Sequence, residues 1–184
     1  MKNNYKIIIV FILTGIYGIY SIYNHSINSN QSKNGCAVFF EQNELGKFEK
    51  CLKDGAESGD AHRQAQLALL YVDGTVVPKN YSMSLKWARL AAEHNEPNAQ
   101  NLLGVLYEEG WGVEQNNHVA YLWYKKSAEQ GLPLAKFNLG RLLYIGKGVK
   151  ANQIEAKKIL NEAADAGETR ASDLINKIDE TEKN

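Results

Sequence analysis

The feature that most constrains the fold is an internal repeat. The segment Gly110-Trp111-Gly112-Val113 corresponds to Gly146-Lys147-Gly148-Val149, 36 residues later. Residues that match or keep their character at this period are Leu67, Leu103 and Leu139; Leu70, Leu106 and Leu142; Ala68, Gly104 and Gly140; Trp87 and Trp123; Ala92, Ala128 and Ala164; and Pro97 and Pro133. A period of this length is typical of stacked units that bury their apolar faces only against neighbouring units.

Each unit reads as two helices joined by a turn. In the second copy, Pro97 suits the first turn of a helix, where its missing N–H costs nothing. The following apolar residues recur at helical spacing: Leu102, Leu103, Leu106 and Tyr107. Gly110 is expected to end this helix, because glycine adopts the left-handed cap without penalty. A second helix is expected to stop at Gly131, and the small Gly104 would let the two helices approach closely.

The Gly-x-Gly sequence also raises the possibility of a nucleotide site. A dinucleotide fingerprint has a third glycine three residues later, follows a strand and opens a helix. Here Gln115 stands at the third glycine position and the preceding element is a helix. We therefore predict a turn between helices and no bound cofactor.

The pattern AQNLLGVLYEEGWGV…AYLWYKKSAEQG, followed by AKFNLGRLLYIGKGV…EAKKILNEAADAG, resembles the Sel-1-like repeat, a relative of the tetratricopeptide repeat. The resemblance implies an all-α protein, a right-handed α-solenoid of antiparallel helix pairs. It places three repeats at residues 61–96, 97–132 and 133–167, with capping helices at 36–60 and 168–184. The chain departs from the pattern at Val76, which replaces a turn glycine, and at Ile159-Leu160, which replace Trp-Tyr.

The N-terminus has a different character. Lys2 and Lys6 precede an uncharged apolar run, Ile7–Tyr23, which is the pattern of an export signal or of a short membrane span. It is either an uncleaved anchor or a removed signal peptide. In both cases the two lysines before the segment keep the N-terminus inside, so the rest of the chain crosses the membrane. Residues 24–35 are polar enough for a flexible tether. We expect a location in the cell envelope, anchored in the inner membrane and facing the periplasm or exterior, or secretion if the segment is cleaved.

Two cysteines, Cys36 and Cys51, begin the predicted folded part. An even number of cysteines in an exported chain favours a disulfide, although two buried free thiols are the alternative. The sequence offers no further ligands at a spacing suited to a metal site. We expect a disulfide that stabilises the N-terminal cap.

The resemblance implies a module that holds another protein in a groove lined by the first helices. Residues that vary between copies at i, i+4 and i+7 share one helical face, and such a row is a candidate for partner binding. The row consists of Ala65, Leu69 and Val72; Asn101, Val105 and Glu108; and Phe137, Arg141 and Tyr144, of which the last six are the predicted groove residues. Alternatively, these side chains only cover the groove. Trp111, in the variable turn position, is a possible exposed contact, whereas Trp87 and Trp123 are expected in the core.

Composition and motifs argue against other functions. The 21 basic residues equal the 21 acidic ones, without the basic excess typical of nucleic-acid binders. Some cysteine-rich relatives of the repeat are linked to penicillin binding and β-lactam hydrolysis, yet no serine here begins a Ser-x-x-Lys motif. The four histidines show no metal-ligand spacing. We therefore predict a protein-binding scaffold and no enzyme; the alternatives are a hydrolase of β-lactam or cell-wall substrates and a secreted effector.

Overall fold

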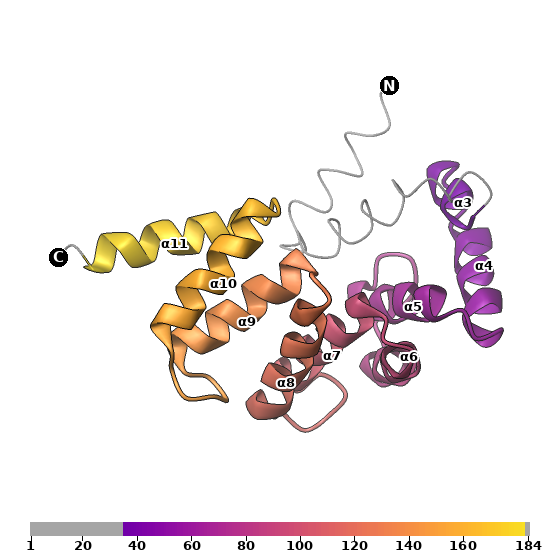
Figure 1. The fold of residues 1–184 in the computed structure, drawn as a ribbon. Coiled ribbons are helices and arrows are strands. Elements are labelled where there is room, and N and C mark those ends of the chain that lie inside the picture. The colour runs from indigo at the N-terminus through magenta and orange to yellow at the C-terminus, as the bar shows by residue number, and fades with distance from the viewer. Residues whose placement is uncertain (1–34, 183–184) are drawn as a thin grey trace.

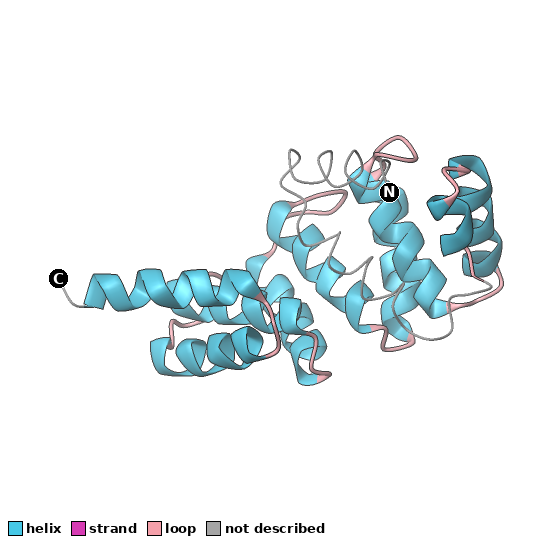
Figure 2. Cartoon of the chain, turned by 90° about the horizontal axis from the view of Figure 1, so that it is seen from above, coloured by secondary structure: helices cyan, strands magenta, loops and turns pink. Residues whose placement is uncertain are grey.

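The computed structural model describes residues 35–182, and all regular structure within that range is α-helical (Figures 1 and 2). The helices are α3 (Ala37–Glu41), α4 (Leu45–Glu57), α5 (Ala61–Asp73), α6 (Tyr81–Glu93), α7 (Pro97–Glu109), α8 (Asn117–Glu129), α9 (Pro133–Ile145), α10 (Gln153–Asp165) and α11 (Thr169–Glu182). The predicted anchor, residues 7–23, and nearly all of the predicted tether lie outside the described residues. Among the helices of residues 35–182, none is long and apolar enough to span a membrane.

Consecutive helices pack against one another along the whole described chain, and α5 also contacts α7. The three repeats correspond to the pairs α5–α6, α7–α8 and α9–α10, with α4 before them and α11 after them. Figure 1 shows the two ends of this series far apart, as expected when each unit touches only its neighbours. The predicted α-solenoid of helix pairs is therefore confirmed.

Local sequence signals account for where the helices begin and end. Pro97 occupies the first turn of α7, as predicted, and the equivalent Pro133 occupies the first turn of α9. The first helices end at Gly74, Gly110 and Gly146, all in the left-handed conformation. The second helices begin after Asn80, Asn116 and Asn152, whose side chains each accept a hydrogen bond from a backbone N–H in the first turn. Such caps satisfy N–H groups that have no partner within the helix.

Small residues on the first helices make room for large residues on the second. A Cβ atom on Gly104 would overlap the ring of Tyr124, and one on Gly140 would lie 2.8 Å from Cγ of Leu160. Tyr124 and Leu160 are almost fully buried. Gly104 therefore permits the expected close approach of the two helices, because it leaves room for the buried ring of Tyr124.

The two repeated tryptophans differ in burial. Trp87 is buried in the core, as expected. Trp123 is half-buried: its ring packs against the core while the ammonium group of Lys126 lies 4.5 Å from the ring centroid. The conserved position thus serves packing in both repeats, and in the second repeat it also borders solvent.

Cys36 and Cys51 form the predicted disulfide, which joins the start of α3 to α4. The rings of Phe40 and Phe48 lie beside this link, with centroids 5.2 Å apart. Phe48 and Leu52 are buried and continue the core toward the repeats. The short α3 is thereby held against the end of the solenoid.

Replacing both Cys36 and Cys51 by serine is expected to lower the free energy of unfolding by about 2 kcal/mol, because the reduced chain regains loop entropy in its unfolded state. Urea unfolding followed by circular dichroism measures the loss. Reductant should destabilise the native protein by a similar amount and leave the serine variant unchanged. A native protein indifferent to reductant would contradict the prediction.

Candidate interaction surface

The six predicted groove residues do not form one exposed row. Val105, Phe137, Arg141 and Tyr144 are half-buried, whereas Asn101 and Glu108 are each only 3% exposed. The interpretation that residues varying between copies are free for a partner is therefore not supported for Asn101 and Glu108. Their side chains hold neighbouring repeats together.

Asn101 lies between the second and third repeats. Its side-chain oxygen accepts a hydrogen bond of 2.9 Å from the amide nitrogen of Asn138, which is also buried. A buried amide without a partner would cost free energy, so the pair fixes α7 against α9. Neither group is available to a ligand.

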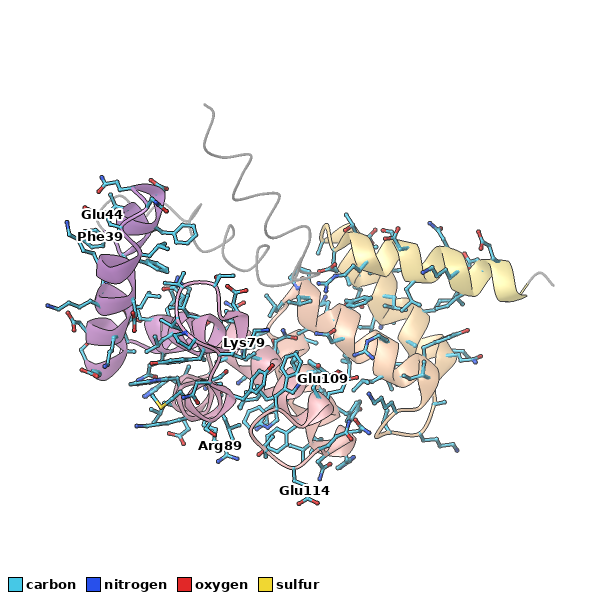
Figure 3. All side chains as sticks on the ribbon, turned by 180° about the vertical axis from the view of Figure 1, so that it is seen from behind. Phe39, Glu44, Lys79, Arg89, Glu109 and Glu114 are labelled. Carbon is cyan, nitrogen blue, oxygen red and sulfur yellow. A yellow bond between two sulfur atoms is a disulfide. The ribbon has the colours of Figure 1, made fainter. Side chains whose placement is uncertain are left out.

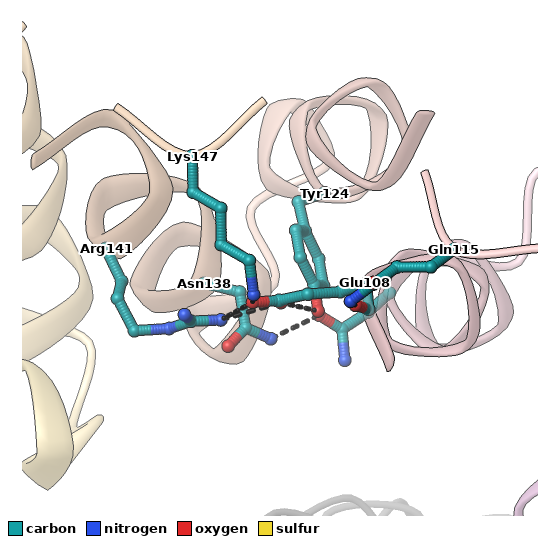
Figure 4. Close-up of polar contacts among 7 residues, drawn as sticks. Glu108, Gln115, Tyr124, Asn138, Arg141 and Lys147 are labelled. Carbon is teal, nitrogen blue, oxygen red and sulfur yellow. Dashed lines mark hydrogen bonds and ion pairs between the residues drawn. The ribbon is translucent and has the colours of Figure 1, made fainter. Parts of the chain in front are cut away.

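Glu108 is the centre of a second contact between these repeats, which we call the Glu108 clasp (Figure 4). Tyr124 donates its hydroxyl hydrogen to Oε2 at 2.9 Å. Arg141 donates from Nη2 to both carboxylate oxygens at 3.0 and 2.7 Å, and Lys147 donates from Nζ to Oε1 at 2.9 Å. Gln115 donates to the backbone carbonyl of Glu108 at 2.6 Å. One buried carboxylate thus joins α7 and α8 to the third repeat.

The electrostatics of the clasp favour the ionised carboxylate. Burial works to raise the pKa of Glu108, but the hydrogen bonds from Arg141 and Lys147 outweigh it, so the pKa lies below its ordinary value. Burial and the neighbouring Glu108 raise the pKa of Tyr124 well above its ordinary value, which keeps its hydroxyl protonated. Donors and acceptor are therefore matched at neutral pH.

A coordinated change between copies is the sequence signal that identifies the clasp. The charged members are Glu108, Arg141 and Lys147, and the equivalent residues one repeat earlier are Val72, Val105 and Trp111. All three positions are apolar at the first junction between repeats and charged at the second. An alignment of the repeats at a period of 36 does not reveal the coordinated change. Arg141 and Lys147 lie 33 and 39 residues after Glu108, so the interacting residues do not occupy equivalent positions.

Trp111 is not a freely exposed contact residue. It is half-buried, and its ring stacks on that of Tyr81 with centroids 5.0 Å apart and an interplanar angle of 17°. Tyr81 begins α6 of the preceding repeat, so Trp111 joins the first and second repeats. The structure therefore does not support an exposed contact at Trp111, whose ring packs against the preceding repeat.

The accessible part of the predicted row lies in the third repeat. The side chains of Arg141 and Lys147 are 30% and 33% exposed, beside the half-buried Tyr144. Arg141 uses only Nη2 in the clasp, and in the described part of the chain its Nε and Nη1 donors have no protein partner. Phe137 is partly covered, since the guanidinium of Arg170 lies 4.9 Å from its ring centroid. We call Phe137, Arg141, Tyr144 and Lys147 the third-repeat face.

Two of the histidines lie in contacts between helices of the solenoid. Residues 35–182 contain no cluster of three or more His, Cys, Asp or Glu side chains suited to a metal ion. His118 lies 3.0 Å through Nδ1 from the carbonyl oxygen of Gly148, a contact between the second and third repeats. His62 lies 3.8 Å through Nδ1 from Oε2 of Glu96, which caps α7. His118 therefore contributes to a contact between repeats, and His62 to a contact between α5 and the N-terminal end of α7.

The His62–Glu96 pair makes the first junction sensitive to pH. The interaction with Glu96 raises the pKa of His62 above 6.5, against the opposing effect of burial. A raised pKa in the folded state gives stability that is fully present below the unfolded value and is lost as pH rises through the folded value. The difference in melting temperature between the native protein and a His62→Gln variant should therefore be larger at pH 5.5 than at pH 8.5. A difference independent of pH would contradict this.

With the fold and the contacts between repeats established, the molecule belongs to the class of α-solenoid repeat proteins. The family model described as Sel1 repeat matches residues 64–96, 97–132 and 133–168, and the chain belongs to this family. Sel1 repeats generally act as scaffolds for interactions between proteins. Comparison with curated proteins gives no match.

Solved structures of Sel1-like repeat proteins are similar. A protective antigen from uropathogenic Escherichia coli, with an SLR fold, is 39% identical with a TM-score of 0.61; the match covers 65% of this chain and only 26% of the antigen. A Sel1 repeat protein from Oxalobacter formigenes is 34% identical with a TM-score of 0.60, over 68% of this chain and 95% of that one. Cysteine-rich protein B of Helicobacter pylori, 24% identical with a TM-score of 0.57 over 71% of this chain and 94% of its own, shares the fold.

Proposed function

We propose that this protein is a non-catalytic scaffold of the cell envelope that binds a partner protein on the third-repeat face. The observation that carries the proposal is the pair of cations in the clasp: Arg141 and Lys147 remain about one third exposed and keep unused hydrogen-bond donors. Arg and Tyr are enriched among residues that dominate binding energy at protein interfaces. Tyr144 adds such a side chain to the same face.

Packing between Sel1 repeats does not in general require cations at these two positions. At the junction of the first and second repeats, Val105 and Trp111 take the places of Arg141 and Lys147, and the helices still pack. The third-repeat face therefore carries charged side chains at two positions where the second repeat has apolar ones, and these side chains are available to a partner. The location in the envelope rests on the apolar segment Ile7–Tyr23, and an intact-mass measurement on protein from the native host would show whether that segment is retained.

Photo-crosslinking in the native host tests the proposal. A photoreactive phenylalanine analogue is placed at Tyr144, and, in a control, at Lys158, which is exposed on α10. Both positions lie in the third repeat, so differences in expression or location of the chain cancel. We expect a covalent adduct with another polypeptide from position 144 and none from position 158. Adducts at equal yield from both, or from neither, would refute binding at this face.

A further inference from the structure

The distribution of charge along the second and third repeats suggests the chemistry of the partner. Residues 130–154 include four cations and no carboxylate: Lys136, Arg141, Lys147 and Lys150. Residues 97–117 have the opposite character, with Glu108, Glu109 and Glu114 and no cation. The first helix and turn of the third repeat are thus uniformly basic, although the whole chain is neutral.

Contacts within the protein neutralise only part of this positive charge. Arg141 and Lys147 share the single carboxylate of Glu108, and Lys136 pairs with Glu162 at 2.8 Å. Four cations therefore meet two carboxylates. Lys150 is exposed and makes no ion pair in residues 35–182.

Three nearby acidic residues make no ion pair with these cations in the described part of the chain: Glu109, Glu114 and Glu155, the last of which accepts a hydrogen bond from Asn152. Glu109 is exposed and acts on Arg141 only through its longer-range field. Glu114 points away from the protein in the turn after α7 (Figure 3). Both are exposed, so water and dissolved salt weaken their attraction for the cations.

Apolar side chains lie beside the excess charge. Ile145, the last residue of α9, is 55% exposed, and Ile154, in the first turn of α10, is 87% exposed. The residues equivalent to Ile145 in the earlier repeats are the acidic Asp73 and Glu109. Because α9 ends where the turn into α10 begins, both isoleucines flank the same turn as Lys147 and Lys150. Isolated exposed apolar residues need no explanation, but here two accompany unneutralised cations.

We infer that the partner presents an acidic segment that also carries apolar side chains, and that this segment binds the third-repeat face and the adjoining turn, residues 146–152. This inference rests on the proposed function and specifies its partner. The unused Nε and Nη1 donors of Arg141 suit a carboxylate, because guanidinium–carboxylate hydrogen bonds are charge-assisted. A peptide is favoured over an anionic membrane because Arg141 and Lys147 are recessed, each about one third exposed, whereas a flat bilayer reaches protruding groups.

Selection from a displayed library of random peptides tests this, with the purified full chain as bait. Peptides enriched by the native protein should carry more negative charge than the starting library and contain at least one aliphatic or aromatic residue. The variant Lys150→Glu, which leaves the Glu108 clasp intact, should bind the enriched acidic peptides about twofold to fivefold more weakly, the effect of an exposed ion pair. The control Lys158→Glu makes the same change of charge on α10 and should bind like the native protein.

Each outcome is informative. Enriched peptides without negative charge, or acidic peptides insensitive to Lys150→Glu, would overturn the acidic partner while leaving a crosslinked partner at Tyr144 possible. No enrichment together with no crosslink would reject both proposals. Vesicles of phosphatidylglycerol, compared with phosphatidylcholine, provide a further arm: binding to the anionic vesicles that Lys150→Glu abolishes, without peptide selection, would assign the surface to a membrane and overturn the proposal.

Discussion

Replacing Glu108 by alanine is expected to lower the free energy of unfolding by about 3 kcal/mol, the lower end of the range for breaking a buried ion pair. The change removes the acceptor shared by Tyr124, Arg141 and Lys147. The tyrosine hydroxyl then remains buried without its partner, which is costly. The two cations can turn partly toward water, which limits the loss. Urea unfolding of the two proteins measures it.

The neighbouring Glu109 provides the matched control. It is exposed and forms no ion pair in the described part of the chain, so Glu109→Ala should change stability by less than about 0.5 kcal/mol. Tyr124→Phe alone should cost about 1 kcal/mol, since Glu108 keeps both cations. In the double variant with Glu108→Ala the cost should be less than the sum. Equal effects of Glu108→Ala and Glu109→Ala would show that the clasp contributes nothing.

The second large effect is expected for Gly148→Ala, which should lower stability by about 3 kcal/mol or more through left-handed strain and overpacking together. Gly148 has a φ of 75°, and a Cβ atom there would overlap the carbonyl group of Asn117. Asn117 begins α8, the second helix of the preceding repeat, and its backbone has little freedom to move. The glycine therefore serves both the turn and the contact between repeats.

Gly131→Ala separates these two causes. Gly131 has a similarly positive φ of 89°, but nothing lies within 4 Å of where its Cβ would stand. Its substitution should therefore cost only the strain of the left-handed conformation, about 1–2 kcal/mol. Thermal unfolding of both variants gives the comparison. Identical losses would mean that the contact with Asn117 adds nothing to stability.

Much of the fold could be predicted from the sequence because it depends on local signals and periodicity. Pro97, Gly110 and Gly146 mark helix ends by conformational preferences that need no tertiary information. The Cys36–Cys51 disulfide could also be anticipated, because two cysteines allow only one intramolecular pairing. These features repeat or stand alone, so one sequence is enough to reveal them.

The interaction surface was predicted less well because variability between copies has two causes. A residue can vary because it faces solvent or a partner, as Tyr144 does in part, or because its contact in the next repeat varies with it. Asn101 and Glu108 belong to the second kind, since each pairs with a residue that is itself different from its equivalents. The two causes can be distinguished only when the structure shows which residues of neighbouring repeats are in contact.

The Glu108 clasp also has a consequence for how such a protein can change its length. Repeat proteins are commonly pictured as strings of interchangeable modules, in which one copy can be duplicated or deleted by recombination. A second copy of residues 97–132 inserted after the first would place Val105 and Trp111 where Arg141 and Lys147 now meet Glu108. The buried carboxylate would lose both cations, with a cost comparable to the substitution above. The order of the second and third repeats is therefore encoded in their chemistry, because neither the first nor the second repeat carries a cation at the positions of Arg141 and Lys147.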